Sequence, residues 1–154
     1  MAAVVQKTVV TQKLEGRCVS HSRTDIAVRD RSVTLDEPLE RGGTNLGLTP
    51  TETLMAALIG CTNVITHKVA HRLGVPIKSM NVRAEAQFDR RGVTLQDEID
   101  VPFPSVTLYV DLETDADAMS VERVKRELAM YCPIAKVLRG AGTDLREVWS
   151  VKRG

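Results

Sequence analysis

The longest apolar stretch of the chain lies between Thr49 and Gly74 and predicts one long helix. Its start is marked by Thr49 as the cap, Pro50 at the first helical position and Glu52 where a capping-box carboxylate reaches back to the cap amide. Its end is marked by Gly74, which can take the left-handed conformation just past a helix and is followed two residues later by a proline. We therefore expect the chain to fold around this helix, which carries Cys61 near its middle.

The side chains of this helix are apolar over most of its circumference. At about 100° per residue, one narrow arc holds five of them, Leu54, Leu58, Cys61, Ile65 and Val69. Cys61 is therefore predicted to point into a packed interior. Small residues at Ala56, Ala57 and Gly60 allow another backbone to approach, and an apolar helix must be covered on every side. The polar residues of the last turns should reach solvent, namely Asn63, Thr66, His67, Lys68, His71 and Arg72.

Alternation of apolar and polar residues predicts the strands. It is clearest from Met80 to Phe88 and from Val106 to Leu112, which we interpret as two strands of one sheet, and Leu145 to Val151 reads as a last strand. Residues 26–35 predict a short hairpin that turns at Asp30 and Arg31. Residues 4–19 suit one or two further strands.

Two shorter helices and a glycine-rich loop complete the pattern. Ser120 is the expected cap of a half-buried helix that runs to Tyr131. Cys132 precedes Pro133, which disfavours a helical cysteine and begins a short helix that stops at Gly140. The loop at residues 36–48 could present backbone amides to an anion, although such loops are more often mobile connectors.

The order of elements indicates an α+β fold, with a largely antiparallel sheet packed on the long central helix. A length of 154 residues predicts a single domain, residues 1–154. The net charge of +1 and the aromatic content of 3% argue against a nucleic-acid or anionic membrane surface, so we expect a small substrate. No apolar run approaches the length needed to span a bilayer and no leader is recognised at the start, which predicts a soluble, cytoplasmic protein without a membrane partner.

The chain has 3 cysteines, an odd number that favours reduced thiols over a disulfide framework. Cys132 beside a helix N-terminus should have its thiolate favoured, whereas a buried Cys61 keeps its proton unless a cation or donor stands near it. From spacing alone, Cys61 is more simply a small buried hydrophobe, and Cys18 is expected to be structural.

Other candidate groups are weaker. His67 and His71 are spaced to share a metal, but no HExxH pattern exists and both project away from the Cys61 arc, so no metal site is predicted. For the same reason His67 does not suit a Cys-His pair, which leaves His21 if folding brings it close. Glu52 lies about 180° around the helix from Cys61, which favours capping over catalysis. Arg41, before a pair of glycines, is among the nearest unplaced cations.

Two segments resemble the paired cysteine motifs of the OsmC/Ohr superfamily of osmotically induced proteins and organic hydroperoxide reductases. They are GGTNLGLTPTETLMAALIGCT, which ends just after Cys61, and YCPIAKVLRG around Cys132. The resemblance covers nearly the whole chain and implies an OsmC-like fold and an intertwined homodimer. It also implies that Cys61 attacks an organic hydroperoxide and that Cys132 resolves the sulfenic acid into a disulfide.

The same resemblance implies a thiol peroxidase of the oxidative stress response that needs no bound cofactor and is recycled by a dithiol reductant, lipoyl or thioredoxin-like. Thr51 stands where hydroperoxide reductases place a catalytic glutamate, with Glu52 one position later. Arg41 is the candidate for the catalytic arginine by its loop position alone. Two rivals stay open, an OsmC-like protein that only binds an apolar ligand at the dimer interface, and a thiol hydrolase or acyl-transfer enzyme that uses Cys61 with a distant histidine.

Overall fold

The computed structural model describes residues 7–154. The chain divides into two compact units, Met1–Thr53 and Leu54–Gly154, and the division falls inside the long helix. Val4 and Val5, which the sequence pattern assigned to a strand, lie outside the described residues.

The first unit contains a three-stranded antiparallel sheet in the order β1, β2, β3. Its strands are β1 (Glu15–Cys18), β2 (Thr24–Val28) and β3 (Arg31–Leu35). The predicted hairpin is confirmed, with Val28 paired to Arg31 across the turn. The strand region before it is shorter than expected, because from residue 7 onward pairing to β2 begins only at Glu15.

The loop after β3 folds around the carboxylate of Asp36, which is fully buried. The backbone amides of Glu37, Thr44 and Leu46 donate to this carboxylate at 2.8, 3.2 and 3.1 Å, and the Thr44 hydroxyl donates to it as well. These hydrogen bonds hold the pKa of Asp36 far below its usual range, and the bond from the Thr44 hydroxyl has the largest effect. The Asp36 carboxylate accepts the backbone amides that could otherwise bind an anion, so the loop is not an open anion site. The same hydrogen bonds fix the loop, which is therefore not a mobile connector.

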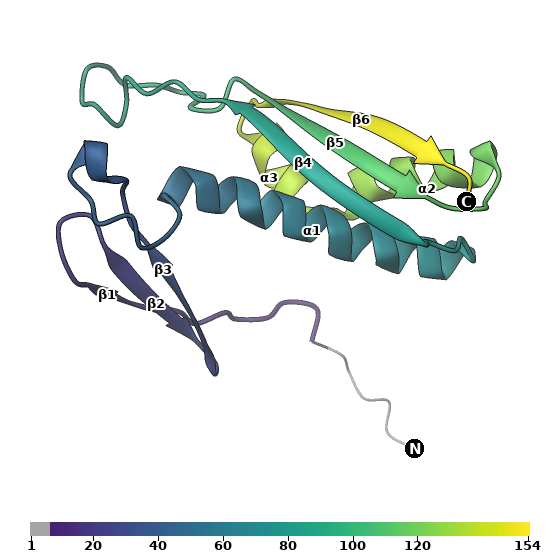
Figure 1. The fold of residues 1–154 in the computed structure, drawn as a ribbon, viewed down its shortest axis with the longest axis horizontal. Coiled ribbons are helices and arrows are strands. Elements are labelled where there is room, and N and C mark those ends of the chain that lie inside the picture. Colours follow the sequence, from purple (N-terminus) through teal and green to yellow (C-terminus); the bar gives the residue numbers. More distant parts are fainter. Residues whose placement is uncertain (1–6) are drawn as a thin grey trace. The chain divides into compact units, whose positions relative to one another are not determined.

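The second unit carries most of the long helix and a second three-stranded sheet (Figure 1). Its elements are α1 (Pro50–Leu73, which begins in the first unit), β4 (Ser79–Gln87), β5 (Ser105–Glu113), α2 (Ala118–Tyr131), α3 (Pro133–Gly140) and β6 (Asp144–Lys152). Strands β4 and β5 are antiparallel, as expected, whereas β5 and β6 are parallel. The chain thus has an α+β fold with two small sheets and mainly antiparallel pairing.

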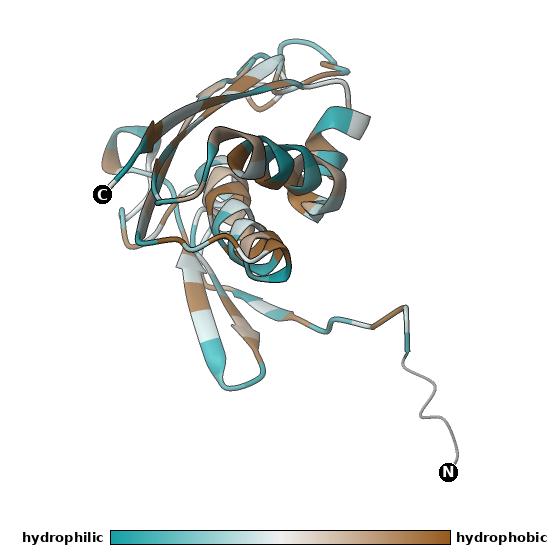
Figure 2. Cartoon of the chain, turned by 90° about the vertical axis from the view of Figure 1, so that its right-hand side faces the viewer, coloured by the Kyte–Doolittle hydropathy of each residue, from teal (hydrophilic) through white to brown (hydrophobic). Residues whose placement is uncertain are grey.

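The core of the second unit lies between this sheet and the three helices, which all lie on one side of the sheet (Figure 2). The inward residues of β5 are almost fully buried, as the alternation predicted. They meet Leu58 of α1, Leu128 of α2 and Leu138 of α3. Burial of such side chains contributes roughly 1.5–3 kcal/mol each and fixes the helices against the sheet.

Both ends of α1 follow the predicted signals. Glu52 accepts a hydrogen bond from the Thr49 amide at 2.9 Å, the Glu52 amide donates to the Thr49 hydroxyl at 3.2 Å, and Gly74 has a φ of 68°. The expectation that Thr66 reaches solvent was wrong, because Thr62 and Thr66 lie with Leu58 on the buried side of the helix.

The exposed side of α1 is largely apolar over the first half of the helix. It includes Ala56, Ala57 and Gly60, together with Val64, whose side chain is 48% exposed. Contrary to the sequence-based expectation, this helix of 24 residues is long and apolar enough to span a membrane. The central helix of a soluble protein meets the same criterion, so length and composition alone do not show whether α1 spans a membrane.

Helices α2 and α3 meet at Cys132. The cap of α2 is Asp117 and not Ser120, because the Asp117 carboxylate accepts the Ser120 amide at 2.9 Å and the helix has already begun at Ala118. Cys132 is extended, with φ −69° and ψ 107°, as expected for a residue before proline. This break turns the chain from α2 into α3 and leaves Cys132 as the N-cap residue of α3.

Candidate functional site

Two cysteines that are 71 residues apart in sequence meet in the core of the second unit. The Sγ atom of Cys132 lies 3.3 Å from the Sγ atom of Cys61 and donates a hydrogen bond to it. Cys61 comes from the middle of α1, and Cys132 comes from the break between α2 and α3. The distance is too long for a disulfide, whose sulfur atoms are about 2.05 Å apart, so both thiols are free. A shift of roughly 1.3 Å would bring them to bonding distance.

Cys132 is the more deeply buried of the two thiols. Its side chain is 1% exposed and belongs to the core cluster with Leu58, Leu128 and Ala135. Burial raises the pKa of Cys132 to about 11, and the backbone amides of Ala135 and Ile134 at the start of α3 lower it by less than burial raises it. The expectation that the helix N-terminus favours the Cys132 thiolate was therefore wrong, because desolvation of the charge outweighs the helix amides.

Cys61 has access that Cys132 lacks. It is partly exposed and packs against the edge of the same core, beside the partly buried side chains of Leu54, Met55 and Ile65. A small molecule can therefore reach Cys61 from the surface, while Cys132 stands behind it. Cys61 is accessible past apolar side chains, and Cys132 is in contact with it. Such a pair of thiols is suited to two-step redox chemistry.

The two other predicted site residues belong to the first unit. Glu52 serves the capping box of α1, as its spacing indicated. Arg41, in the short helix η1 (Leu39–Arg41), pairs with Glu37 at 3.1 Å and is more than half exposed. The structure therefore brings Cys61 and Cys132 together, and it assigns Glu52 and Arg41 local partners within their own unit.

The other candidate residues, His67, His71 and Cys18, form no catalytic or metal-binding cluster in the described part of the chain. His67 and His71 are exposed on α1, and the Nδ1 atom of His67 lies 2.9 Å from the Asn63 carbonyl oxygen. Within residues 7–154, no group of three or more His, Cys, Asp or Glu side chains could hold a metal ion. Cys18, which was expected to be structural, is exposed on β1.

A pocket between α1 and the end of α2 was not predicted. It encloses about 290 Å³ and is lined by Ile65, Lys68, Val69, Arg72 and Tyr131. Ile65 is one helical turn beyond Cys61 and packs against the same core, and Tyr131 directly precedes Cys132. The helical spacing between Cys61 and the α1 residues of this pocket was visible in the sequence. That Tyr131 lies opposite them could be seen only in the folded structure.

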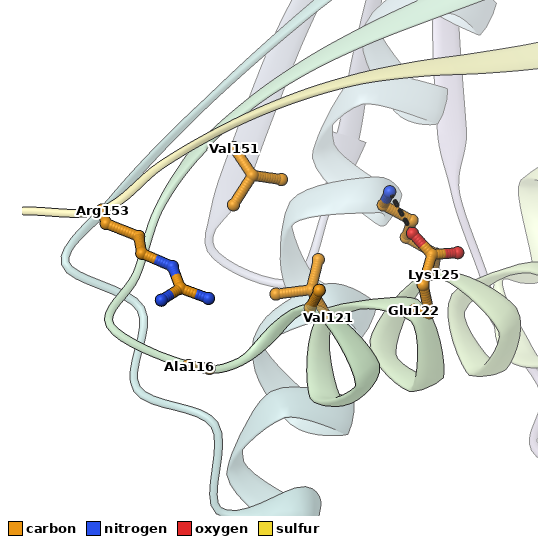
Figure 3. A pocket seen from close by; sticks show the side chains of 7 residues that line it. Ala116, Val121, Glu122, Lys125, Val151 and Arg153 are labelled. Atoms are coloured by element: carbon orange, nitrogen blue, oxygen red, sulfur yellow. Dashed lines mark hydrogen bonds and ion pairs between the residues drawn. The ribbon is translucent and has the colours of Figure 1, made fainter.

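A second cavity, of about 260 Å³, lies between the start of α2 and the end of β6 (Figure 3). Arg153 extends from the end of β6 toward Val121, and Lys125 is held by Glu122 at 2.6 Å. Its lining includes neither Cys61 nor Cys132 nor a sequence neighbour of either one. The pocket lined by Ile65 and Tyr131 contains neither cysteine either, but its lining includes the residue before Cys132 and one a helical turn from Cys61, so it is the better candidate for binding a substrate.

Comparison with known proteins identifies relatives of this fold. A family model described as OsmC-like protein matches residues 43–147. The crystal structure of an OsmC-like protein from Mycoplasma pneumoniae superposes with a TM-score of 0.78 at 13% identity, over 92% of this chain and 97% of that chain. No match was found among curated proteins.

Two other similar structures bear names that refer to organic hydroperoxide resistance. The protein from Legionella pneumophila has a TM-score of 0.69 at 18% identity, over 94% of this chain and 99% of that chain. The protein OhrB of Bacillus subtilis has a TM-score of 0.60 at 18% identity, over 92% of this chain and 98% of that chain. At these identities the similarity establishes the fold.

Proposed function

Because the chain belongs to the OsmC-like protein family, we propose that it is a thiol peroxidase that reduces organic hydroperoxides to alcohols. The observation that carries this proposal is the 3.3 Å separation of the Cys61 and Cys132 sulfur atoms in an apolar core. The names of the structures from Legionella pneumophila and Bacillus subtilis support the same substrate class.

The proposed reaction has three balanced steps. The Cys61 thiol attacks the outer peroxide oxygen, the O–O bond breaks, and the products are an alcohol and a Cys61 sulfenic acid. The Cys132 sulfur then attacks the Cys61 sulfur, and the sulfenic oxygen leaves as water with the proton of Cys132. A dithiol reductant, lipoyl or thioredoxin-like, finally reduces the disulfide and is itself oxidised. None of these steps needs a metal or an organic cofactor.

The positions of the two thiols support these separate roles. Cys61 is the partly exposed thiol, which suits the group that meets the peroxide. Cys132 is buried and its pKa is raised, so it stays protonated near pH 7 and resists direct oxidation until a sulfenic acid forms next to it. Arg41 and Glu52 stay proposals from the sequence as catalytic residues, and the contacts that the structure gives them are the ion pair of Arg41 with Glu37 and the capping of α1 by Glu52.

The first test is oxidation of the purified, reduced protein with one equivalent of cumene hydroperoxide. We expect the intact mass to fall by about 2 Da, because the Cys61–Cys132 disulfide forms by net loss of two hydrogens. Peptide mapping should recover both cysteines in one cross-linked peptide pair, and Cys18 should remain open to alkylation. An unchanged mass with all three cysteines still alkylated would contradict the peroxidase proposal and favour a protein that only binds an apolar ligand.

The protein is further proposed to act in the cytoplasm as a homodimer that covers the exposed side of α1. An apolar helix face in water is unfavourable, and the small residues there allow close approach of a second helix. Gly60 tests this point, because a Cβ atom added at Gly60 meets no atom within 4 Å in the single chain.

We expect Gly60→Leu to weaken the dimer by at least about tenfold, since the larger side chain blocks helix contact without clashing inside the protomer. Sedimentation velocity over a range of concentrations measures the dissociation constant, and circular dichroism checks that the protomer stays folded. As the matched control, Gly140→Ala adds a methyl group that also meets nothing within 4 Å and should leave the dimer intact. A folded Gly60→Leu protein with unchanged dimer affinity would exclude contact through this face.

A further inference from the structure

The hydrogen bond between the two thiols has a direction. Cys132 donates it to the Cys61 sulfur over 3.3 Å, and within residues 7–154 the Cys61 sulfur receives no other hydrogen bond. A cysteine among apolar side chains keeps its proton unless a cation or a hydrogen-bond donor stabilises its thiolate. In the described part of the chain, Cys132 is therefore the group placed to stabilise Cys61 as a thiolate.

Cys132 keeps the proton that it donates. Its side chain is almost fully buried, and burial raises the pKa of Cys132 to about 11, so the S–H group persists near pH 7. The backbone amides of Ala135 and Ile134 act in the opposite direction on this pKa, because they favour negative charge on the Cys132 sulfur. The same amides polarise the S–H bond and make it a stronger donor. Electrostatic support thus runs from the start of α3 through Cys132 to Cys61.

The local structure holds Cys132 in this donating position. Its backbone amide donates to the Leu128 carbonyl at 2.9 Å, and its carbonyl accepts the Lys136 amide at 3.1 Å. The backbone on both sides of the cysteine is therefore anchored, to α2 and to α3. Its side chain belongs to the same core cluster as Leu58 of α1. The donor is in place before any oxidant arrives.

We infer that Cys132 has a second role besides resolution: in the reduced protein its S–H group stabilises the Cys61 thiolate and so activates it as a nucleophile. The relevance of this role to hydroperoxides rests on the proposed peroxidase function. The activation itself does not, because a thiolate also attacks other electrophiles.

This role leaves the proposed reaction balanced. Cys61 releases its proton to solvent when the thiolate forms, and the alkoxide that leaves after O–O cleavage takes a proton back. Cys132 keeps its own proton through this first step and gives it up only when the sulfenic oxygen leaves as water. The same S–H group therefore serves first as a donor and then as the source of the resolving sulfur.

Three substitutions at Cys132 separate donation from resolution. None of them can form the disulfide, but Cys132→Ser keeps a group that can donate to a thiolate, whereas Cys132→Ala and Cys132→Val have no donor. Valine also fills the space of the sulfur, which leaves less room for a water molecule to replace the donor. All three are made in a Cys18→Ser background, so that Cys61 is the one remaining cysteine.

The first measurement is the rate at which iodoacetamide alkylates Cys61 near pH 7, followed by intact mass. We expect the alanine and valine variants to react roughly three- to tenfold more slowly than the serine variant. They lose a hydrogen bond to a charged group, and the greater nucleophilicity of a more basic thiolate offsets part of this loss. The serine variant should react within about twofold of the Cys18→Ser parent. The ultraviolet absorbance of the thiolate reports the same order independently, and circular dichroism checks the fold.

The second measurement is the first turnover with one equivalent of cumene hydroperoxide, with dimedone present to trap the sulfenic acid. The variants should follow the same order as in alkylation. Equal alkylation rates in the serine variant and both donor-free variants would overturn the second role of Cys132. A rate that falls equally in all three would also overturn it, because the sulfur would then matter only for packing.

The outcomes separate this inference from the proposed function. If alkylation follows the expected order but neither the parent nor any variant reduces the hydroperoxide, the donor role stands and the peroxidase proposal fails. If every variant completes the first turnover at the same speed and alkylation rates are equal, the donor role is excluded and the peroxidase proposal stands.

Discussion

Replacing Cys61 with serine is expected to abolish hydroperoxide reduction, with a loss on the order of 10³-fold or more in kcat/KM. A serine hydroxyl stays protonated near pH 7 and lacks the nucleophilicity of a thiolate toward peroxide oxygen. Consumption of cumene hydroperoxide, followed with a dithiol reductant present, measures the effect. Since serine is close to cysteine in size, the thermal unfolding temperature should change little.

Cys132→Ser should fail at a different step. Cys61 is still expected to reduce one equivalent of hydroperoxide, but the sulfenic acid then has no thiol within reach and accumulates or is oxidised further. A dimedone adduct on Cys61 in the mass spectrum reports this state. Steady turnover should fall to a small residual rate, while the first turnover keeps its wild-type speed.

Cys18→Ser is the matched control for both variants. Cys18 is exposed on β1, and its replacement should leave turnover unchanged. Full hydroperoxide turnover by Cys132→Ser would remove Cys132 from the mechanism. A hydrolase or acyl-transfer enzyme that needs Cys61 alone predicts instead no hydroperoxide turnover and an ester-cleaving activity that survives Cys132→Ser. An acyl ester that labels Cys61 would support that alternative.

Gly47→Ala is expected to destabilise the protein by about 3 kcal/mol or more. A Cβ atom at Gly47 would lie 2.0 Å from the carbonyl oxygen of Thr34 in β3, far inside van der Waals contact with rigid backbone. The loop would have to leave β3 and break the 3.0 Å hydrogen bond from the Asp36 amide to the Leu48 carbonyl. The free energy of unfolding in urea measures the loss.

Gly140→Ala provides the contrast at a helical glycine. A Cβ atom added there meets nothing within 4 Å, and alanine is favoured over glycine in a helix by roughly 0.5–1 kcal/mol. We therefore expect a small gain in stability from this variant. A Gly47→Ala protein as stable as the wild type would mean that the loop does not pack against β3 in solution.

Local signals in the sequence were sufficient for α1 and the hairpin of the first unit. The capping box of Thr49 and Glu52 and the stop at Gly74 act within a few residues, so no tertiary information is needed to place the helix ends. The alternation in β5 likewise predicted its buried face. By contrast, the cap of α2 was predicted at Ser120 but is Asp117. Both residues can cap a helix, and the conformation of the preceding loop decides which of them does.

The features that sequence missed depend on contacts between distant segments. The parallel pairing of β5 and β6 follows from the direction in which α3 returns the chain, which no local pattern encodes. Thr66 is buried because it lies on the side of α1 that packs against the rest of the second unit, together with Leu58. The raised pKa of Cys132 reflects complete burial, and the helix N-terminus alone suggested the opposite.

For the candidate site, the two cysteine segments identified the residues that meet, but only the fold gave their 3.3 Å separation. The cavity lined by Lys68 and Tyr131 joins α1 to the end of α2, so neither segment alone could indicate it. No spacing in the sequence assigns a cation to Cys61, and Arg41 stays a proposal for that reason.

Burial of the Cys132 thiol also couples folding to alkaline pH. A cysteine in the unfolded chain loses its proton near pH 8.5, whereas the folded protein keeps the proton of Cys132 until about pH 11. Between these values the native state binds more protons than the unfolded state, so rising pH removes stability that is fully present below the lower value. In the proposed Cys61–Cys132 disulfide this thiol would have no proton to lose, so oxidation would remove the alkaline sensitivity at the break between α2 and α3.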